Sequence, residues 1–450
     1  MRTRIWHAHV MTSVVGCTAL VLAATGTVAH AQPQAQPQAQ PQAQPQARDL
    51  GRETLAVGDG WGSEGAGTTG GAAAIGEQVH TVATWAEFKA ALKAGGDAPK
   101  IVKVKGVIDP VAEGCASFQA PGYDFAAYLE KYSPETWGLD TDLSGEPADS
   151  PEGLRAASAA NQDTAIKANV PANTTIVGVG KGAGIRGGSL QIKGVDNVIL
   201  RNLTIEAPLD CFPQWDPTDT DTGAWNSEYD AVVVYGSTHV WVDHNTLTDG
   251  RYPDSTLPTY FGRTYQQHDG LLDVVRGANH VTVSWNAVEN HDKTMLIGNS
   301  DSAGATDTGK LKVTLHHNKF EGTVERAPRV RFGQVDSYNN HFVVTEEQSY
   351  GYTFGVGASS QLYASDNAFS LPAGVSAAKT LKKWSEAPLT AENNYVNGRR
   401  TDLIAVHNAE IPAETLRSGA GWKPTLRTRV DSPRAVPGIV DGRAGAGKVC

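Results

Sequence analysis

Five segments of the chain superpose on one another without gaps, and this repetition limits the folds that the chain can adopt. In each segment an asparagine stands five residues after the first apolar residue, and another apolar residue follows two positions later. The segments are VWVDHNTL (240–247), VTVSWNAV (281–288), VTLHHNKF (313–320), VDSYNNHF (335–342) and LYASDNAF (362–369). Their asparagines are separated by 41, 32, 22 and 27 residues; they are Asn245, Asn286, Asn318, Asn340 and Asn367. A short repeat with insertions of variable length is typical of a parallel β-helix, in which each repeat forms one coil.

The segment VILRNLTI (198–205) fits the same frame with its asparagine one position earlier, at Asn202. Because stacked strands lie about 4.8 Å apart, equivalent residues of successive coils form ladders. We therefore expect the asparagines to bond to one another and to backbone groups in the turns. An antiparallel sandwich is the alternative, but dipeptides typical of hairpin turns are sparse in this sequence, which favours the β-helix.

One helix is predicted near the start of the body, where Thr84 and Glu87 form a capping box ahead of FKAALK. Phe88 and Leu92 then share one face. The glycine-rich string GVGKGAG (178–184) resembles a phosphate-binding loop, but the β-type segment GGSLQI follows it instead of a helix. A glycine-rich turn of the β-helix is therefore the better interpretation.

The two ends of the chain differ in composition from the rest. Residues 1–31 combine an arginine-containing start, an apolar stretch and the small-x-small site Ala29–Ala31, which predicts a signal peptide and a secreted, extracellular protein. Residues 32–50 form a Gln/Pro/Ala-rich linker. We assign residues 51–430 to a single β-helix domain and residues 431–450 to a C-terminal tail.

Cysteine usage fits an oxidising compartment. Cys17 lies in the signal segment, where a lipoprotein is a minor alternative because apolar residues continue after it. The remaining three cysteines imply one bridge plus a free thiol, or an intermolecular pair. We prefer a Cys115–Cys211 bridge because Cys450 is the last residue of the chain.

Charge is distributed unevenly along the chain. The formal net charge is -10, which argues against a nucleic-acid partner. Against this background ERAPRVRFGQ (325–334) concentrates three arginines within six residues, Arg326, Arg329 and Arg331. A regular strand would point Arg326 and Arg331 to opposite faces, whereas a bulge at Pro328 could bring them to the same face. A site for an anion is one explanation of this cluster.

Three aspartates adjoin β-type segments on neighbouring predicted coils. Asp230 lies in SEYDAVVV (227–234), and Asp269 and Asp273 lie in HDGLLDVV (268–275). If their carboxylates converge, they need a hard cation with oxygen ligands, and calcium suits irregular coordination better than magnesium. Aspartates that cap the backbone are an equally weighted alternative. Glu228 is a weaker candidate for the same cluster, and Lys293 falls between the aspartates and the arginines in coil order.

Taken together, several blocks resemble the pectate lyase superfamily, polysaccharide lyase family 1. The blocks are WVDH (241–244), HDGLLD (268–273), VTVSWN…NHDKTMLIGNSD (281–301) and RAPRVRFGQ (326–334), and the likeness runs from about Gly58 to about Asn397. The resemblance implies an all-β fold: a single-stranded, right-handed parallel β-helix with a short N-terminal capping helix and long loops over a groove. It further implies calcium-dependent β-elimination on polygalacturonate.

The resemblance also implies roles for individual residues. Asp230, Asp269 and Asp273 match calcium (Ca2+) ligands, Arg326 matches the catalytic base, and Lys293 and Arg331 match residues that bind uronate carboxylates. For Arg329 we expect a structural role, paired with a carboxylate. For Asp243 and His244 we expect a ladder or core role.

A guanidinium is normally protonated. We expect crowding of Arg326 among calcium and two cations to favour its neutral form, with a pH optimum above about pH 8. The protein is predicted to be a monomer that acts on pectate, with neither nucleic acid nor membrane as a partner. The alternatives are a pectin lyase acting on methyl-esterified chains, a polygalacturonase using paired carboxylates, and a non-catalytic pectin-binding β-helix.

Overall fold

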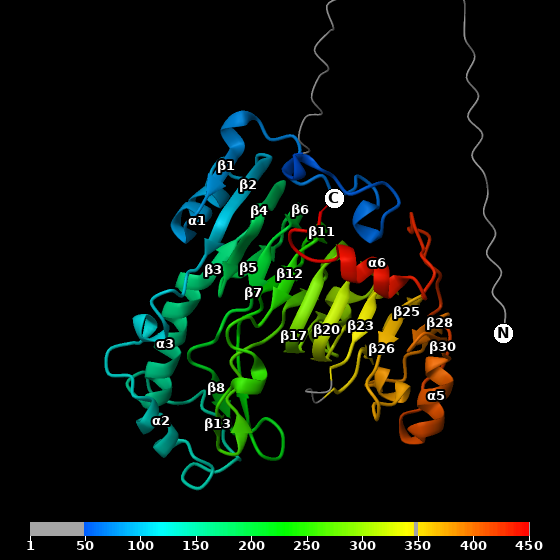
Figure 1. Cartoon of the computed structure of the whole chain (residues 1–450). Coiled ribbons are helices and arrows are strands. Elements are labelled where there is room, and N and C mark those ends of the chain that lie inside the picture. Colours follow the sequence, from blue (N-terminus) through cyan, green and yellow to red (C-terminus); the bar gives the residue numbers. More distant parts are fainter. Residues whose placement is uncertain (1–48, 346–349, 450) are drawn as a thin grey trace, which may run out of the picture. The chain divides into compact units, whose positions relative to one another are not determined.

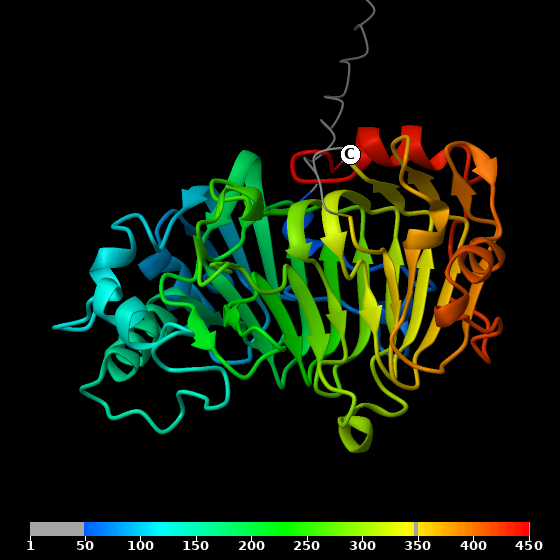
Figure 2. The same ribbon diagram turned by 90° about the horizontal axis from the view of Figure 1, so that it is seen from below.

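The computed structural model describes residues 49–345 and 350–449. The predicted signal peptide, most of the predicted linker and Cys450 lie outside the described residues. The described residues from Asp49 onward form one compact unit. Within this unit three rows of parallel strands stack coil upon coil (Figure 1, Figure 2).

One row is an eight-stranded sheet in which every pairing between neighbours is parallel. Its strands are β3 (Lys167–Asn169), β5 (Ser189–Lys193), β10 (Val232–Tyr235), β15 (Leu272–Val275), β18 (Leu296–Ile297), β21 (Arg329–Val330), β24 (Phe354–Val356) and β27 (Leu381–Lys383).

The other two rows belong to an 18-stranded sheet. The second row contains β1 (Val79–Val82), β2 (Lys100–Ile108), β4 (Thr174–Arg186), β6 (Asp196–Arg201), β11 (Thr238–Asp243), β16 (Asn279–Ser284), β19 (Val313–His316), β22 (Gln334–Tyr338), β25 (Gln361–Ser365) and β28 (Leu389–Glu392). The third row contains β7 (Thr204–Glu206), β12 (Thr246–Thr248), β17 (Ala287–Lys293), β20 (Lys319–Glu325), β23 (His341–Val343), β26 (Ala368–Ser370) and β29 (Tyr395–Val396).

From β5 to β29 the chain visits the three rows in turn, for example through β15, β16 and β17, so each of these coils contributes one strand to each row. Among the described residues, antiparallel pairing is limited to short pairs, two of them outside the parallel ladders and one at the end of the third row. These pairs are β8 (Gln214–Asp216) with β9 (Ala224–Asn226), β13 (Thr259–Tyr260) with β14 (Arg263–Thr264), and β29 with β30 (Arg399–Arg400). The stacked parallel strands exclude the antiparallel sandwich.

The predicted asparagine ladder is confirmed. The backbone N–H of each ladder asparagine donates to the side-chain oxygen of the next, from Asn245 to Asn286 at 2.8 Å through to Asn340 and Asn367 at 3.0 Å. Asn394, which the sequence analysis missed, extends the ladder by one coil, at 3.1 Å from Asn367. The residue before each ladder asparagine is left-handed, for example His317 with φ 55°. The ladder therefore stabilises the corner between the second and third rows.

The capping box of α1 (Trp85–Lys93) is confirmed, with Thr84 as N-cap and Glu87 closing it. Phe88 and Leu92 are buried as expected, and the glycine-rich string 178–184 lies inside strand β4. The other helices are α2 (Phe125–Lys131), α3 (Pro151–Ile166), α4 (Gly304–Asp307), α5 (Leu403–Glu410) and α6 (Val436–Arg443). Short 3-10 turns are η1 (Leu50–Arg52), η2 (Trp61–Ser63), η3 (Gly76–Gln78), η4 (Cys115–Phe118), η5 (Asp254–Thr256), η6 (Ala377–Thr380) and η7 (Pro412–Glu414).

Figure 1 shows α1 at the β1 end of the strand rows and α5 at the β28 end. Helix α6 packs through Val436 and Val440 against Ala368 of β26, so residues of the predicted tail lie on the body. The disulfide Cys115–Cys211 is present, as predicted. Among the described residues, no helix has the length and apolar character that a membrane crossing requires.

Candidate active site

The three predicted aspartates meet at the start of two neighbouring strands in the middle of the eight-stranded sheet, β10 and β15. Asp230 lies two residues before β10, and Asp273 lies in β15, in register with Val233 of β10. Backbone groups fix both carboxylates: Asp230 Oδ1 accepts a hydrogen bond from the Gly270 N–H at 2.9 Å, and Asp273 Oδ1 accepts one from the Leu296 N–H at 2.8 Å.

Gly270 allows the carboxylates of Asp230 and Asp273 to approach each other. A Cβ atom at position 270 would lie 2.6 Å from Asp273 Oδ1 and 2.8 Å from Asp230 Oδ1, closer than such atoms approach in proteins. The absence of a side chain therefore leaves a small cradle lined by oxygen atoms. This donor set and this space fit a hard cation.

The negative charges of the three aspartates are not fully compensated by positive charges of the protein. Loss of hydration, and then the charges of Asp273 and Asp269, hold the pKa of Asp230 well above its usual value. Loss of hydration and the charge of Asp269 raise the pKa of Asp273 to about 7. Asp269 is more exposed, and its Oδ1 lies 3.5 Å from Lys293 Nζ. Glu228 is exposed, and its backbone N–H donates to Asp210.

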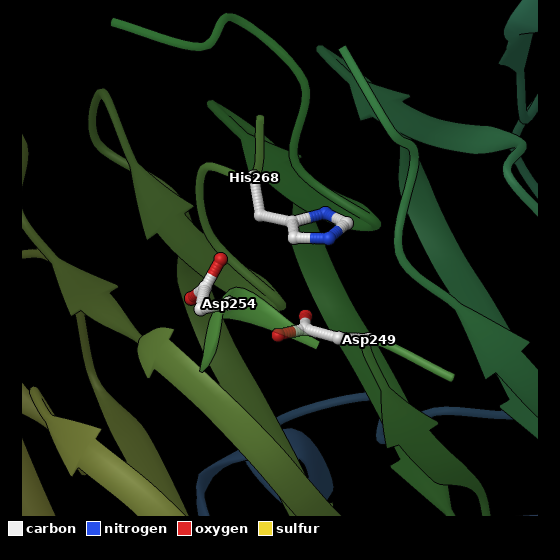
Figure 3. Close-up of side chains that lie close together, drawn as sticks. All are labelled: Asp249, Asp254 and His268. Atoms are coloured by element: carbon white, nitrogen blue, oxygen red, sulfur yellow. The ribbon is translucent and has the colours of Figure 1, made fainter. Parts of the chain in front are cut away.

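A second acidic cluster lies beside the first and was missed by the sequence analysis. Asp249, Asp254 and His268 each bring one potential ligand atom within 4.8 Å of the others (Figure 3). His268, however, meets carbonyl oxygens with both ring nitrogens, those of Pro208 at 2.9 Å and Tyr252 at 2.7 Å. Both ring nitrogens of His268 are therefore engaged by backbone carbonyl oxygens.

His291 connects the second cluster to Asp269. Its Nδ1 lies 2.5 Å from Asp249 Oδ1, and its Nε2 lies 2.6 Å from the Asp269 backbone oxygen. Burial lowers the pKa of His291, but the charge of Asp249 outweighs this and raises it to about 9. The Asp249–His291 ion pair is fully buried and supports the loop that carries Asp269.

The predicted cations lie on the coils that follow. Lys293 ends β17 in register with Glu325, the last residue of β20. Arg326 comes next, in the left-handed conformation with φ 60°, and its Nε donates to Glu325 Oε1 at 2.7 Å. Arg331 Nε donates to Asp301 Oδ1 at 2.5 Å, and its Nη1 donates to the Gly298 oxygen at 2.9 Å.

The expected neutral form of Arg326 depends on bound calcium, and the protein's own groups act in the opposite direction. Burial lowers its pKa, but the charges of Glu325, Tyr352 and Asp273 outweigh burial, so the pKa is raised. Without a bound cation, the surrounding carboxylates therefore favour the charged guanidinium. The sequence analysis considered the cations around Arg326 and overlooked Glu325, its neighbour in the chain.

The contacts of Arg329 differ from the expected pairing with a carboxylate. Its guanidinium stacks on the ring of Trp384 at 4.0 Å, and among the described residues no carboxylate forms an ion pair with it. Burial, followed by the charge of Arg331, lowers its pKa. Asp243 and His244, which are hydrogen-bonded to each other at 2.7 Å, lie at the end of β11 in the other sheet, where Asp243 is buried and forms an ion pair with Arg201.

Known proteins resemble this chain over most of its length. A family model described as pectate lyase matches residues 49–120 and 145–415. The chain belongs to the pectate lyase family. It is 43% identical over 412 residues to a pectate lyase of Bacillus subtilis, a match that covers 89% of this chain and 94% of the relative. It is 41% identical to pectate lyase E of Dickeya chrysanthemi, over 71% of this chain and 69% of the relative.

Solved pectate lyase structures share the fold of this family member. A pectate lyase bound to a hexasaccharide superposes with a TM-score of 0.82 at 42% identity, covering 90% of this chain and 100% of the other. A thermostable pectate lyase superposes with a TM-score of 0.84 at 42% identity, with the same coverage.

Proposed function

We propose that this protein is a pectate lyase that cleaves α-1,4-linked polygalacturonate by calcium-dependent β-elimination and releases 4,5-unsaturated oligogalacturonates. The observation that carries the proposal is the pair of carboxylates around Gly270, left short of positive charge and facing Lys293 and Arg326, in a member of the pectate lyase family. The pectate lyase structure with a bound hexasaccharide supports the substrate class.

In this proposal the aspartates hold the cation and the basic residues handle the uronate. Asp230, Asp269 and Asp273 supply oxygen ligands for calcium. When bound, calcium provides positive charge beside the substrate carboxylate and stabilises the negative charge that develops there. Lys293 and Arg331 bind uronate carboxylates and orient the sugar ring. Asp301 and the Gly298 oxygen fix the direction of the Arg331 guanidinium.

Arg326 acts as the base that removes the proton from C5 of the uronate. This proton lies next to a carboxylate group, so its removal leaves an enolate-like charge that Lys293 and Arg331 stabilise. The oxygen at C4 then leaves, and the double bond forms between C4 and C5. The reaction requires a neutral Arg326, so Glu325 and Asp273 oppose it until their negative charge is compensated.

The finer architecture also belongs to this proposal. We infer a right-handed coil, capped at its start by α1, with the loops 118–165 and 206–227 bordering the groove. We further infer a secreted monomer with a signal peptide at 1–31, a linker at 32–50, a β-helix domain at 51–430 and a tail at 431–450. The signal segment and the disulfide support secretion.

The proposal is tested by following the ultraviolet absorbance of the unsaturated product on polygalacturonate, with calcium and with a chelator. We expect a rise that requires calcium and that is lost in Arg326→Ala, while circular dichroism shows the fold retained. A rise only on methyl-esterified pectin without calcium would indicate a pectin lyase. Reducing ends without absorbance would indicate hydrolysis, and binding without either signal would indicate a non-catalytic module.

A further inference from the structure

The outward face of the eight-stranded sheet continues past Arg331 for two more coils. Val330 and Val356 are buried in the core, so the residues on either side of them point outward. Strand pairing and the hydrogen bonds from Gly357 N to Val330 O and from Trp384 N to Val356 O align two outward rows. The rows are Arg329, Gly355 and Lys382, and Arg331, Gly357 and Trp384.

Trp384 therefore lies in the same row as Arg331, two coils further on. Two strand spacings separate them, which is about 10 Å. The proposed reaction centre is itself spread along the sheet, from Asp230 before β10 through Asp273 in β15 to Arg331 after β21. A polymer bound across these residues runs along the stack of coils, and one of its two directions leads over β24 and β27.

The middle members of the two rows are glycines, which leave the surface of the sheet low along this path. A Cβ at Gly357 would lie 2.9 Å from Arg331 Cγ, and a Cβ at Gly355 would lie 3.1 Å from Arg329 Cβ. Arg329 crosses this floor to stack on Trp384. Side chains at positions 355 and 357 would obstruct both Arg329 and a ligand.

The indole ring of Trp384 is partly exposed and lies near two positively charged side chains. It remains 44% exposed, an unusual value for a tryptophan. The Arg329 guanidinium lies 4.0 Å from its ring centre, and the Lys382 ammonium, which also pairs with Glu414, lies 5.6 Å away. The rings of Tyr352 and Trp384 pack edge to face, with their centres 6.2 Å apart.

This chemistry suits a uronate unit of the polymer. The C–H face of a pyranose ring packs on an indole, and its carboxylate needs a cation nearby. We propose that Trp384, with Arg329 and Lys382, forms a further binding subsite for polygalacturonate, two coils beyond Arg331. The inference rests on the proposed function and adds a determinant of preferred chain length.

Binding is measured by titration calorimetry with calcium and with di-, tri- and longer oligogalacturonates, using the full-length Arg326→Ala variant so that the ligand is not consumed. We expect affinity to rise with oligomer length. Trp384→Ala in this background should reduce the gain from short to long oligomers by roughly tenfold. Trp384→Phe should restore most of the gain. Lys382→Ala should also reduce the gain in affinity with oligomer length. Lys383→Ala serves as the matched control, because Lys383 is in register with Val356 and so belongs to neither outward row.

Two results would overturn the subsite. One is an equal loss of affinity for short and long oligomers in Trp384→Ala, which would mean that Trp384 acts only through Arg329 and Arg331. The other is an unchanged gain with length. Failure of the proposed function has a different signature: either no oligomer binds to the parent variant, or wild-type enzyme produces no unsaturated product with calcium.

Discussion

Replacing Asp273 by asparagine is expected to stabilise the protein when calcium is absent. Loss of hydration and the charge of Asp269 raise the pKa of Asp273 from 3.8 to about 7. As pH rises through the unfolded-state pKa, the unfolded chain loses a proton that the folded protein keeps, so the folded state becomes progressively less stable until the pH passes about 7. A difference of about 3 pKa units corresponds to about 4 kcal/mol in the free energy of unfolding. Asparagine keeps the acceptor for the Leu296 N–H and carries no charge.

The test is chemical unfolding with a chelator at about pH 5 and about pH 8, followed by the same titrations with calcium. Without calcium, Asp273→Asn should gain stability over wild type, and the gain should be larger at the higher pH. With calcium the order should reverse, because wild type gains the free energy of binding. Asp221→Asn, which changes an exposed loop carboxylate, is the matched control. The reasoning is refuted if Asp273→Asn is less stable than wild type at the higher pH without calcium, or if the difference does not depend on pH.

Two further predictions concern buried polar groups. Asp249→Asn leaves the buried His291 imidazolium without its carboxylate, so we expect a loss of about 3–5 kcal/mol in the free energy of unfolding. Calcium affinity should also fall, because His291 holds the backbone of Asp269; unchanged calorimetric affinity would show that this support is dispensable. Asn340→Ala removes the acceptor that receives two hydrogen bonds from Asn318 and leaves the buried backbone N–H of Asn318 unpaired, with an expected loss of about 2 kcal/mol or more in urea unfolding. A loss typical of an exposed residue would contradict the ladder's role.

The coils could be predicted from sequence because the asparagine ladder recurs with a fixed local frame. The same frame is present at LTAENNYV (389–396), so Asn394 could have been found. Helix α3 was missed although Ser150 and Pro151 mark its start. Its buried side includes polar side chains such as Arg155 and Gln162, so no apolar stripe of helical period identifies it.

The candidate site was predictable in part for the same reason. Asp230 and Asp273 lie at the start of strands in neighbouring coils, and parallel stacking brings the starts of such strands together. Contacts across coils depend on register, and register depends on insertions whose conformations the sequence does not reveal. The contact between Arg329 and Trp384 spans two coils, and the Asp249–His291 pair joins residues 42 positions apart. Neither has a local sequence pattern.

The raised pKa values of the aspartates and the raised pKa of Arg326 are linked through Asp273. Loss of hydration and the charges of the neighbouring aspartates raise the pKa of Asp230 and Asp273. The charge of Asp273 in turn helps to keep Arg326 protonated. Any positive charge that neutralises Asp273 therefore also removes part of the support for the charged form of Arg326. Because the same carboxylate acts on both groups, occupation of the acidic cradle and formation of the base are coupled, and Glu325 remains as the acidic neighbour that opposes the neutral guanidinium.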